Sequence, residues 1–248
     1  MHINLPRALQ GWRKVAAEIA IIVVGVVIAL ALDQYVQARQ WRQQVKHAET
    51  AFEGELAIGA QDTYERLVIQ PCLQGRISEL AEQLNRDEAR WSALPMKLSS
   101  RYYRNVLPVV YRPPYRTVFI DAWRNALADG TLNHLSADHS AQLSGLYKAR
   151  EEFGRLQEQE LEAAGRLTPL AYDRPLDANG RREMLSVLAS IDRTNTLLIR
   201  NSEEMLAALK QFGVKFGKAD VAAMKREVLS VQRDYRGSCV QDLPLDLD

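Results

Sequence analysis

Cysteine is scarce in this chain, and so is any excess of charge of one sign. Two of the 248 residues are cysteines, Cys72 and Cys239, which are too far apart for a CxxC motif. Two thiols alone make a poor zinc site, so we expect no metal centre. The 32 Lys and Arg residues nearly balance the 31 Asp and Glu residues. Nucleic-acid-binding domains normally carry a basic excess, and we therefore expect no nucleic-acid partner.

Catalytic and cofactor motifs are also missing. The chain has no G-x-S-x-G elbow and no HExxH pair. The stretch from Gly213 to Ala219 resembles a phosphate loop, but it is one residue short and has alanine where the metal-binding hydroxyl belongs. His134 and His139 are spaced so that one helix face would not present both to a metal. The sequence predicts a protein that is not an enzyme and has no cofactor. The alternative, an unrecognised hydrolase, requires a pocket holding a perturbed acid, base or nucleophile.

A long apolar run stands near the N-terminus. Ile19 to Leu32 contains no polar residue, and with Val15–Ala17 and Glu18 it forms the segment 15–32. At about 1.5 Å per residue this segment is roughly 27 Å long, enough to cross a bilayer core. It is apolar on all sides, whereas a soluble helix has one apolar stripe. We expect a transmembrane helix over 15–32, after a basic leader over 1–14.

A cleavable signal peptide is the alternative interpretation of this segment. The leader is basic, and Ala29-Leu30-Ala31 is an A-x-A cleavage pattern. Helix-compatible residues continue from Asp33 without a break, which favours an uncleaved anchor. Gly25 and Ala29 form a small-xxx-small pair that would let two such helices approach closely, although this pattern is common in apolar helices.

Basic residues flank the predicted span on both sides. Those of the leader lie closer to it, so we expect the N-terminus in the cytoplasm and the body on the other side of the membrane. That oxidising side would allow a disulfide between Cys72 and Cys239, worth roughly 5 kcal/mol in the chain-entropy model. Two unpaired thiols in a reducing cytoplasm are the alternative. The flanking residues are Arg7, Arg13 and Lys14 before the span and Arg39, Arg42 and Lys46 after it.

Several short patches resemble a family of uncharacterised bacterial single-pass membrane proteins. They are Glu18-Ile19, Gly25, Ala29-Leu30-Ala31, Asp33 with the following aromatic residue, Asp121-Ala122-Trp123 and Gly130-Thr131-Leu132. The resemblance is confined to these patches. It implies an anchor in the bacterial inner membrane that carries a helical domain, and it implies no activity and no catalytic residues.

Apolar residues spaced three and four apart predict an all-α body over 33–238. We expect the span to continue into a stalk helix that Pro71 ends, a second helix packed antiparallel on the stalk, and a bundle of about four long helices in all. Val109-Val110-Tyr111 is a candidate edge strand. A loose acidic tail over 239–248 follows. The further helices are expected at 117–128 closed by Gly130, at 137–167 capped by Ser136, at 188–212 and at 221–235.

One stretch of the body, 89–120, lacks acidic residues and interleaves arginine with tyrosine. Both residue types make good binding surface, through contacts to anions and through stacking. The binding hypothesis assigns lipid headgroups, a cell-wall polymer or a partner's acidic face as targets. The other interpretation, which we favour, is that the stretch packs on the body and neutralises the acidic helix near 151–162. The candidate binding residues are Arg101, Arg104, Tyr111, Arg112, Tyr115 and Arg116.

The sequence therefore predicts where the protein sits better than what it does. We expect a membrane-anchored helical module for protein–protein interaction or scaffolding, with the lipid bilayer and a protein partner or second copy as partners. The alternative is a domain that binds or senses an anion or envelope ligand through the stretch 89–120.

Overall fold

The structure is a computed structural model that describes residues 12–86, 90–96, 108–213, 218–245 and 247. The described residues are mostly helical with almost no strand, and the predicted all-α class is confirmed. The α-helices are α1 (Trp12–Val68), α2 (Gln70–Leu84), α3 (Asp121–Ala128), α4 (Ala137–Arg166), α5 (Ala178–Phe212) and α6 (Lys218–Arg236). Three short 3-10 helices are η1 (Thr131–His134), η2 (Thr168–Ala171) and η3 (Gly237–Cys239).

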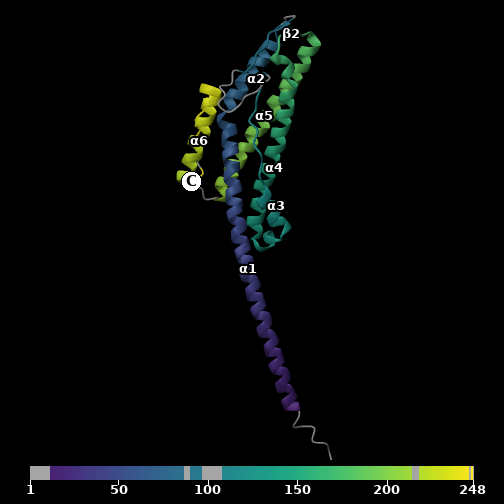
Figure 1. Cartoon of the computed structure of the whole chain (residues 1–248), viewed down its shortest axis with the longest axis vertical. Coiled ribbons are helices and arrows are strands. Elements are labelled where there is room, and N and C mark those ends of the chain that lie inside the picture. The colour runs from purple at the N-terminus through teal and green to yellow at the C-terminus, as the bar shows by residue number, and fades with distance from the viewer. Residues whose placement is uncertain (1–11, 87–89, 97–107, 214–217, 246, 248) are drawn as a thin grey trace, which may run out of the picture.

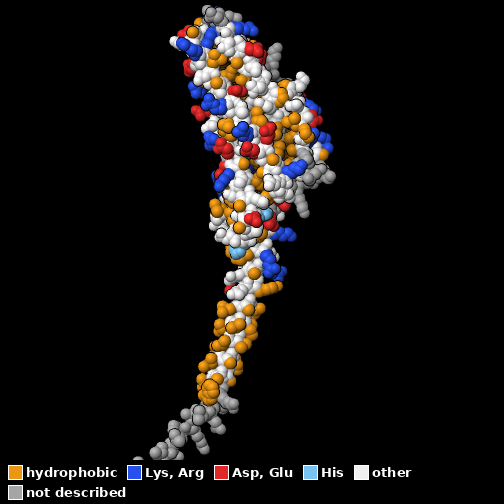
Figure 2. Space-filling model, turned by 180° about the vertical axis from the view of Figure 1, so that it is seen from behind, with side chains coloured by type: hydrophobic (Ala, Val, Ile, Leu, Met, Phe, Trp, Pro, Cys, Tyr) orange, Lys and Arg blue, Asp and Glu red, His pale blue; other side chains and the backbone are white. Residues whose placement is uncertain are grey.

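Helix α1 is 57 residues long and joins the apolar segment to the body without a break. At about 1.5 Å per residue it is roughly 86 Å long. Its N-terminal half projects from the body as a stem whose apolar side chains are exposed (Figures 1 and 2). Among the described residues this is the one helix long and apolar enough to cross a membrane. The helix runs straight through Ala29-Leu30-Ala31.

The body is a bundle in which α4 and α5 pack along one another and α1 packs on α5 and α6 (Figure 1). The apolar seam predicted for α5 is buried, including Leu188, Ile191, Leu198 and Leu209. Buried residues of α1 begin at Phe52, so the stem meets the core about two turns above Lys46. A seam of this kind arises because residues three and four apart share one helix face.

Helix α2 does not fold back on the stalk as predicted. A single residue, Ile69, separates it from α1, and this joint leaves no room for the chain to reverse. Helix α2 therefore continues in the direction of α1 and packs on α5 (Figure 1). Pro71 lies in the first turn of α2, where its missing N–H costs nothing, and α1 ends three residues earlier at Val68.

Residues 108–120 are extended, and the helix predicted from Thr117 begins only at Asp121. Pro113 and Pro114 keep this segment out of a helix and bias the residues before them towards extended backbone. The edge strand predicted at Val109–Tyr111 is not formed. The strand pair in the described chain is instead β1 (Arg90–Trp91) with β2 (Arg174–Pro175). Ser136 caps α4, and Gly130 has the positive φ of 80° that follows a helix end.

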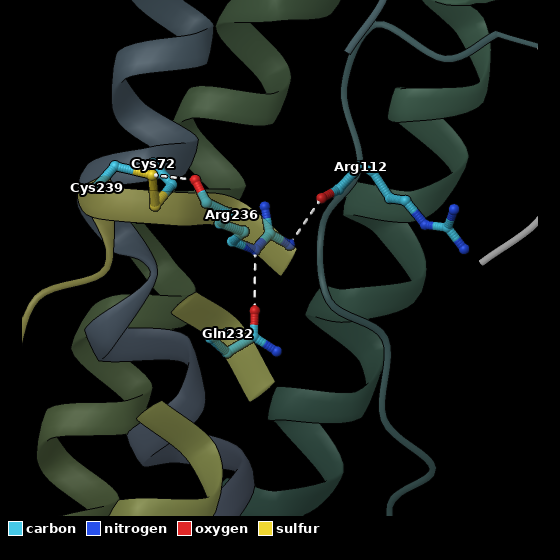
Figure 3. The surroundings of a disulfide bond; sticks show 5 residues. All are labelled: Cys72, Arg112, Gln232, Arg236 and Cys239. Carbon is cyan, nitrogen blue, oxygen red and sulfur yellow. Dashed lines mark hydrogen bonds between the residues drawn. A yellow bond between two sulfur atoms is a disulfide. The ribbon is translucent and has the colours of Figure 1, made fainter. Parts of the chain in front are cut away.

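A disulfide joins Cys72, in the first turn of α2, to Cys239 at the end of η3, with the two Cα atoms 5.1 Å apart (Figure 3). The C-terminal segment beyond it was predicted to be loose, but it packs on the body. The Gln241 N–H donates to the Val68 carbonyl at 2.8 Å, and the Tyr64 hydroxyl donates to the Leu243 carbonyl at 2.9 Å. Leu247 is buried. The apolar residues of this segment outweigh its aspartates in setting its position.

Candidate functional site

The extended segment 108–120 carries four of the six predicted binding residues into the body. It runs alongside α4, between that helix and α6 (Figures 1 and 3). The Arg116 N–H donates to the side chain of Gln157 at 3.0 Å, and the Gln157 amide donates to the Arg116 carbonyl at 3.2 Å. These contacts align the segment with α4. The other two predicted residues, Arg101 and Arg104, lie outside the described residues.

A fully buried ion pair forms the centre of the region. Arg66 of α1 donates to both carboxylate oxygens of Glu160 on α4, at 2.6 and 2.8 Å, and also to the side-chain carbonyl of Asn195 on α5. The Tyr111 hydroxyl donates to the same carboxylate at 2.7 Å. Burial lowers the pKa of Arg66, but the Glu160 carboxylate more than compensates and keeps the guanidinium charged. Burial, reinforced by Glu160, raises the pKa of Tyr111, so this residue is a fixed hydrogen-bond donor.

A second charged cluster lies beside the first and reaches the surface. Arg116 makes a bidentate pair with Glu65 of α1, at 2.6 and 2.5 Å. Gln232 of α6 donates to Glu65 and accepts a hydrogen bond from Arg236 at 3.1 Å. Arg236 also donates to the Arg112 carbonyl at 3.1 Å, whereas the Arg112 guanidinium points away from α6 (Figure 3). Side chains from α1, α6 and the extended segment are thus tied together through Glu65.

These contacts show that the described part of the basic stretch packs on the body. Its Arg116 pairs with Glu65 of α1. The favoured interpretation also has the stretch neutralise the acidic helix near 151–162, and that part stays a prediction. Reversing the charge of Arg116 would place a second carboxylate beside the buried Glu65, so we expect it to destabilise the fold. Charge reversal at this residue is therefore a poor test of binding.

A third polar layer lies lower on α1. Glu55 accepts hydrogen bonds from the Tyr147 hydroxyl and the Ala122 N–H, each at 2.9 Å. Arg150 of α4 is 2 % exposed, donates to the Phe119 carbonyl at 3.2 Å, and lies directly against the backbone of Gly59. Only a residue without a side chain lets the guanidinium approach α1 this closely.

Alanine at Gly59 should destabilise the protein, because the added Cβ would overlap the Arg150 guanidinium and lie 2.6 Å from the terminal methyl of Met205. We expect a loss of about 1–3 kcal/mol, the usual range for overpacking. Gly54→Ala is the matched control on the same helix, since a Cβ there meets nothing within 4 Å. It should stabilise by about 0.5–1 kcal/mol through helix propensity. Thermal unfolding followed by circular dichroism compares them; equal effects of the two changes would contradict the packing described.

Asp62 should make stability depend on pH. Burial raises the pKa of this carboxyl from 3.8 to about 7, Arg150 acts in the opposite direction, and Glu65 adds to the rise. The folded protein therefore binds a proton more tightly than the unfolded chain, and stability falls as the pH rises from about 4 to about 7. Asp62→Asn should remove this part of the pH dependence and stabilise the protein above pH 7. Denaturant unfolding at pH 5 and pH 8 measures it, and an unchanged difference between the two pH values would contradict it.

A cavity of about 330 Å³ opens between the extended segment and α6. Glu65, Arg116, Gln232 and Arg236 form its polar wall. Tyr115, Leu161 and Val231 line its outer part, and they are 47 %, 45 % and 37 % exposed. The cavity thus combines an arginine-bearing wall with exposed apolar side chains.

The distance of this cavity from the apolar segment bears on lipid headgroups, one class of ligand proposed for the basic stretch. Glu65 lies 33 positions beyond Leu32 on one unbroken helix, which corresponds to about 50 Å along its axis. The headgroup layer of a bilayer is only about 5–8 Å deep on each side. Headgroups of a membrane crossed by 15–32 are therefore out of reach of Tyr115 and Arg116.

Sequence reasoning missed most of the residues that build this region, namely Glu65, Arg66, Glu160, Gln232 and Arg236. A signal was present for Arg66 and Glu160. Arg66 follows Thr63 at a spacing of three and so continues the core-facing stripe of α1. Glu160 follows Leu156 at a spacing of four and continues the core-facing stripe of α4. A charged residue on a core-facing stripe requires a buried partner. The pattern could not identify that partner, because 94 residues separate the two.

The two histidines and the small residues of the stem lie apart from this region. His134 stacks on Trp41 of α1 with ring centroids 3.9 Å apart, and His139 lies against Phe212. Within the described ranges, no group of three or more His, Cys, Asp or Glu residues is arranged to hold a metal. Gly25 and Ala29 lie on the exposed stem, and their role in helix pairing stays a prediction. Most of the stretch Gly213–Ala219 lies outside the described residues.

Comparison with known proteins adds no assignment. No family model, no curated protein and no solved structure matches this chain.

Proposed function

We propose that this protein is a membrane-anchored helical module that binds a partner protein at a set height above the bilayer. The observation that carries the proposal is the continuity of α1, in which an exposed apolar stem and a core helix of the body are one helix. A helix that crosses a membrane and also packs in the body holds that body in a defined orientation. In the proposal, α1 anchors an uncleaved chain in a bacterial inner membrane, with the body on the periplasmic side, as the family resemblance and the flanking charges also predict.

The partner surface in this proposal is the cavity between the extended segment and α6. Tyr115, Leu161 and Val231 provide apolar contact area around it. Arg116, whose side chain is 39 % exposed, adds a polar group beside them. An extended segment of a protein with apolar side chains and a polar group fits this combination. The position of the cavity, about 50 Å above the end of the span, suits a partner that also extends well above the membrane.

A small anion is the weaker occupant of the same cavity. Arg116 and Arg236 face it, but Glu65 neutralises the first, and Gln232 and a backbone carbonyl engage the second. The Arg112 guanidinium, which the binding hypothesis also used, points away from α6 (Figure 3).

A catalytic role for this cavity has less support than anion binding. Asp62 has the perturbed pKa that a hydrolase would need, but it does not line this cavity.

Site-specific photocrosslinking in native membranes tests the proposal. A photoreactive residue at Leu161 or Val231 in the full chain should give one discrete protein adduct. The same residue at Leu197 of α5, which is 44 % exposed and does not line the cavity, is the matched control. Adducts of equal pattern from all three positions, or none from any, would overturn the proposed surface. An adduct with a second copy of the chain would identify the partner as itself.

The anchor and its orientation are tested separately. The full chain should stay in the membrane pellet after alkaline carbonate extraction, at the mass of the uncleaved protein. A reporter fused after Asp248 should be active only if it is periplasmic. A soluble protein shortened at Ala31 would contradict the anchor, and a cytoplasmic reporter would reverse the orientation.

A further inference from the structure

We propose that one face of α1, just above the membrane span, is a binding site for the headgroups of anionic phospholipids. The site consists of Tyr35, Arg39, Arg42 and Lys46 and is called the juxtamembrane face below. The inference rests on the proposed membrane anchorage and adds a ligand to it. It does not involve the partner cavity.

The four residues share one side of the helix, because their spacings of four, three and four return to the same face. All four side chains are exposed, and Tyr35 is 62 % exposed. Together with one further residue they line a shallow depression of about 350 Å³. The neighbouring side of α1 is occupied by the body, where Trp41 stacks on His134. The juxtamembrane face is therefore not covered by the body, and basic side chains gather just above the apolar stretch (Figure 2).

The helix itself sets the height of each residue above the span. Tyr35, Arg39 and Arg42 lie about 5, 10 and 15 Å beyond Leu32 along the axis. Helical side chains lean towards the N-terminus, which here is the direction of the membrane. Long basic side chains can also bend towards the headgroup layer, and tyrosine favours that layer for its amphipathic ring. Arg39 and Arg42 are thus placed to contact lipid phosphates, while Lys46, about 21 Å up, adds charge from further away.

Ion pairs within the described residues do not neutralise the charge of this face. Within the part of the chain that the structure describes, neither arginine of the face nor Lys46 forms an ion pair with a carboxylate. Asp33 accepts a hydrogen bond from Gln37 at 2.9 Å on another side of the helix. Arg42 uses its Nε to bond the Ala38 carbonyl at 3.2 Å, which leaves its two terminal nitrogens. Guanidinium groups bind phosphate in bidentate fashion, so the chemistry of this face matches an anionic phosphodiester.

Lipid selectivity at the protein boundary tests the inference. The full chain is reconstituted in vesicles, and spin-labelled phosphatidylglycerol and phosphatidylcholine report by electron paramagnetic resonance how strongly each lipid associates with the protein. The unmodified protein should prefer phosphatidylglycerol. Basic residues near a membrane surface attract anionic lipid, so Arg39→Gln with Arg42→Gln should lower the preference several-fold towards one. Arg200→Gln with Arg226→Gln, two exposed positions in the body, is the charge-matched control and should change nothing.

The result that overturns the inference is an unchanged preference in the Arg39/Arg42 variant. Loss of the preference on adding millimolar glycerol phosphate would also overturn it, because the face would then be a site for soluble anions. Carbonate extraction of the same preparations separates this outcome from failure of the anchor. A protein that stays in the membrane without lipid preference contradicts only this inference, and a protein that leaves the membrane contradicts the proposed function.

Discussion

Replacing Glu160 with glutamine is expected to lower the free energy of unfolding by about 3–5 kcal/mol, the usual cost of removing one partner from a buried ion pair. Glutamine preserves the size of the side chain, so the change removes charge with little change in volume. Arg66 would then be a fully buried cation, since its side chain is 1 % exposed and Glu160 is the carboxylate with which it pairs among the described residues. Denaturant unfolding of the full chain in detergent, followed by circular dichroism, measures the loss.

Two further variants distinguish the effect of losing the Glu160 charge from any effect on the helix itself. Glu158→Gln makes the same change on an exposed position of α4, two residues away, and should alter stability by less than about 0.5 kcal/mol. Arg66→Met combined with Glu160→Met removes both charges together and should recover much of the loss, because it no longer leaves one of them alone in the core. A double variant less stable than Glu160→Gln, or a loss below about 1 kcal/mol in Glu160→Gln itself, would contradict this account.

Removing the disulfide should have an effect of similar size. Cys72 and Cys239 are 167 positions apart, and closing a loop of that length is worth roughly 5 kcal/mol in the chain-entropy model. The bridge also holds the C-terminal segment near the joint between α1 and α2, where Gln241 bonds to Val68. Cys72→Ser combined with Cys239→Ser should therefore destabilise the protein and release this segment. Denaturant unfolding with and without reductant measures the first effect, and limited proteolysis of the C-terminus measures the second.

The reductant provides the internal control for this prediction. It should shift the unfolding midpoint of the unmodified protein and leave that of the double serine variant unchanged. Protein isolated from membranes under thiol-blocking conditions should contain no free thiol, since a persistent structural disulfide requires an oxidising compartment. Free Cys72 and Cys239 in that preparation would contradict the proposed periplasmic orientation as well as the bridge.

The elements of the fold were largely predictable because they depend on neighbours along the chain. Ser136 marks the start of α4 through its side-chain acceptor, and Gly130 follows the end of α3 with a positive φ. The seam from Leu188 to Leu209 indicates which side of α5 is buried. Each of these signals operates over four residues or fewer, or repeats at that spacing, so no knowledge of the remaining structure was needed.

The direction of α2 and the course of 108–120 were not predictable in the same way. Pro71 marks a helix boundary, but a proline is compatible with the end of one helix and with the first turn of the next. Whether the chain reverses depends on the length of the joint, which is the single residue Ile69. The extended segment contains few local signals beyond its prolines, and its position is set by side chains such as Gln157 on another element.

The sequence by itself determined the apolar segment, the all-α class and the faces by which the helices pack, because composition and spacing are properties of the chain alone. The tertiary structure decided which charges meet. Arg66 with Glu160 and Arg116 with Glu65 join residues 94 and 51 positions apart, and Cys72 with Cys239 joins positions 167 apart. A charge on a core-facing stripe shows that a partner must exist, but only the packing of α1, α4 and the extended segment selects it. The physical reason is that burial makes an unpaired charge costly, while the choice of partner depends on which groups the fold brings within contact distance.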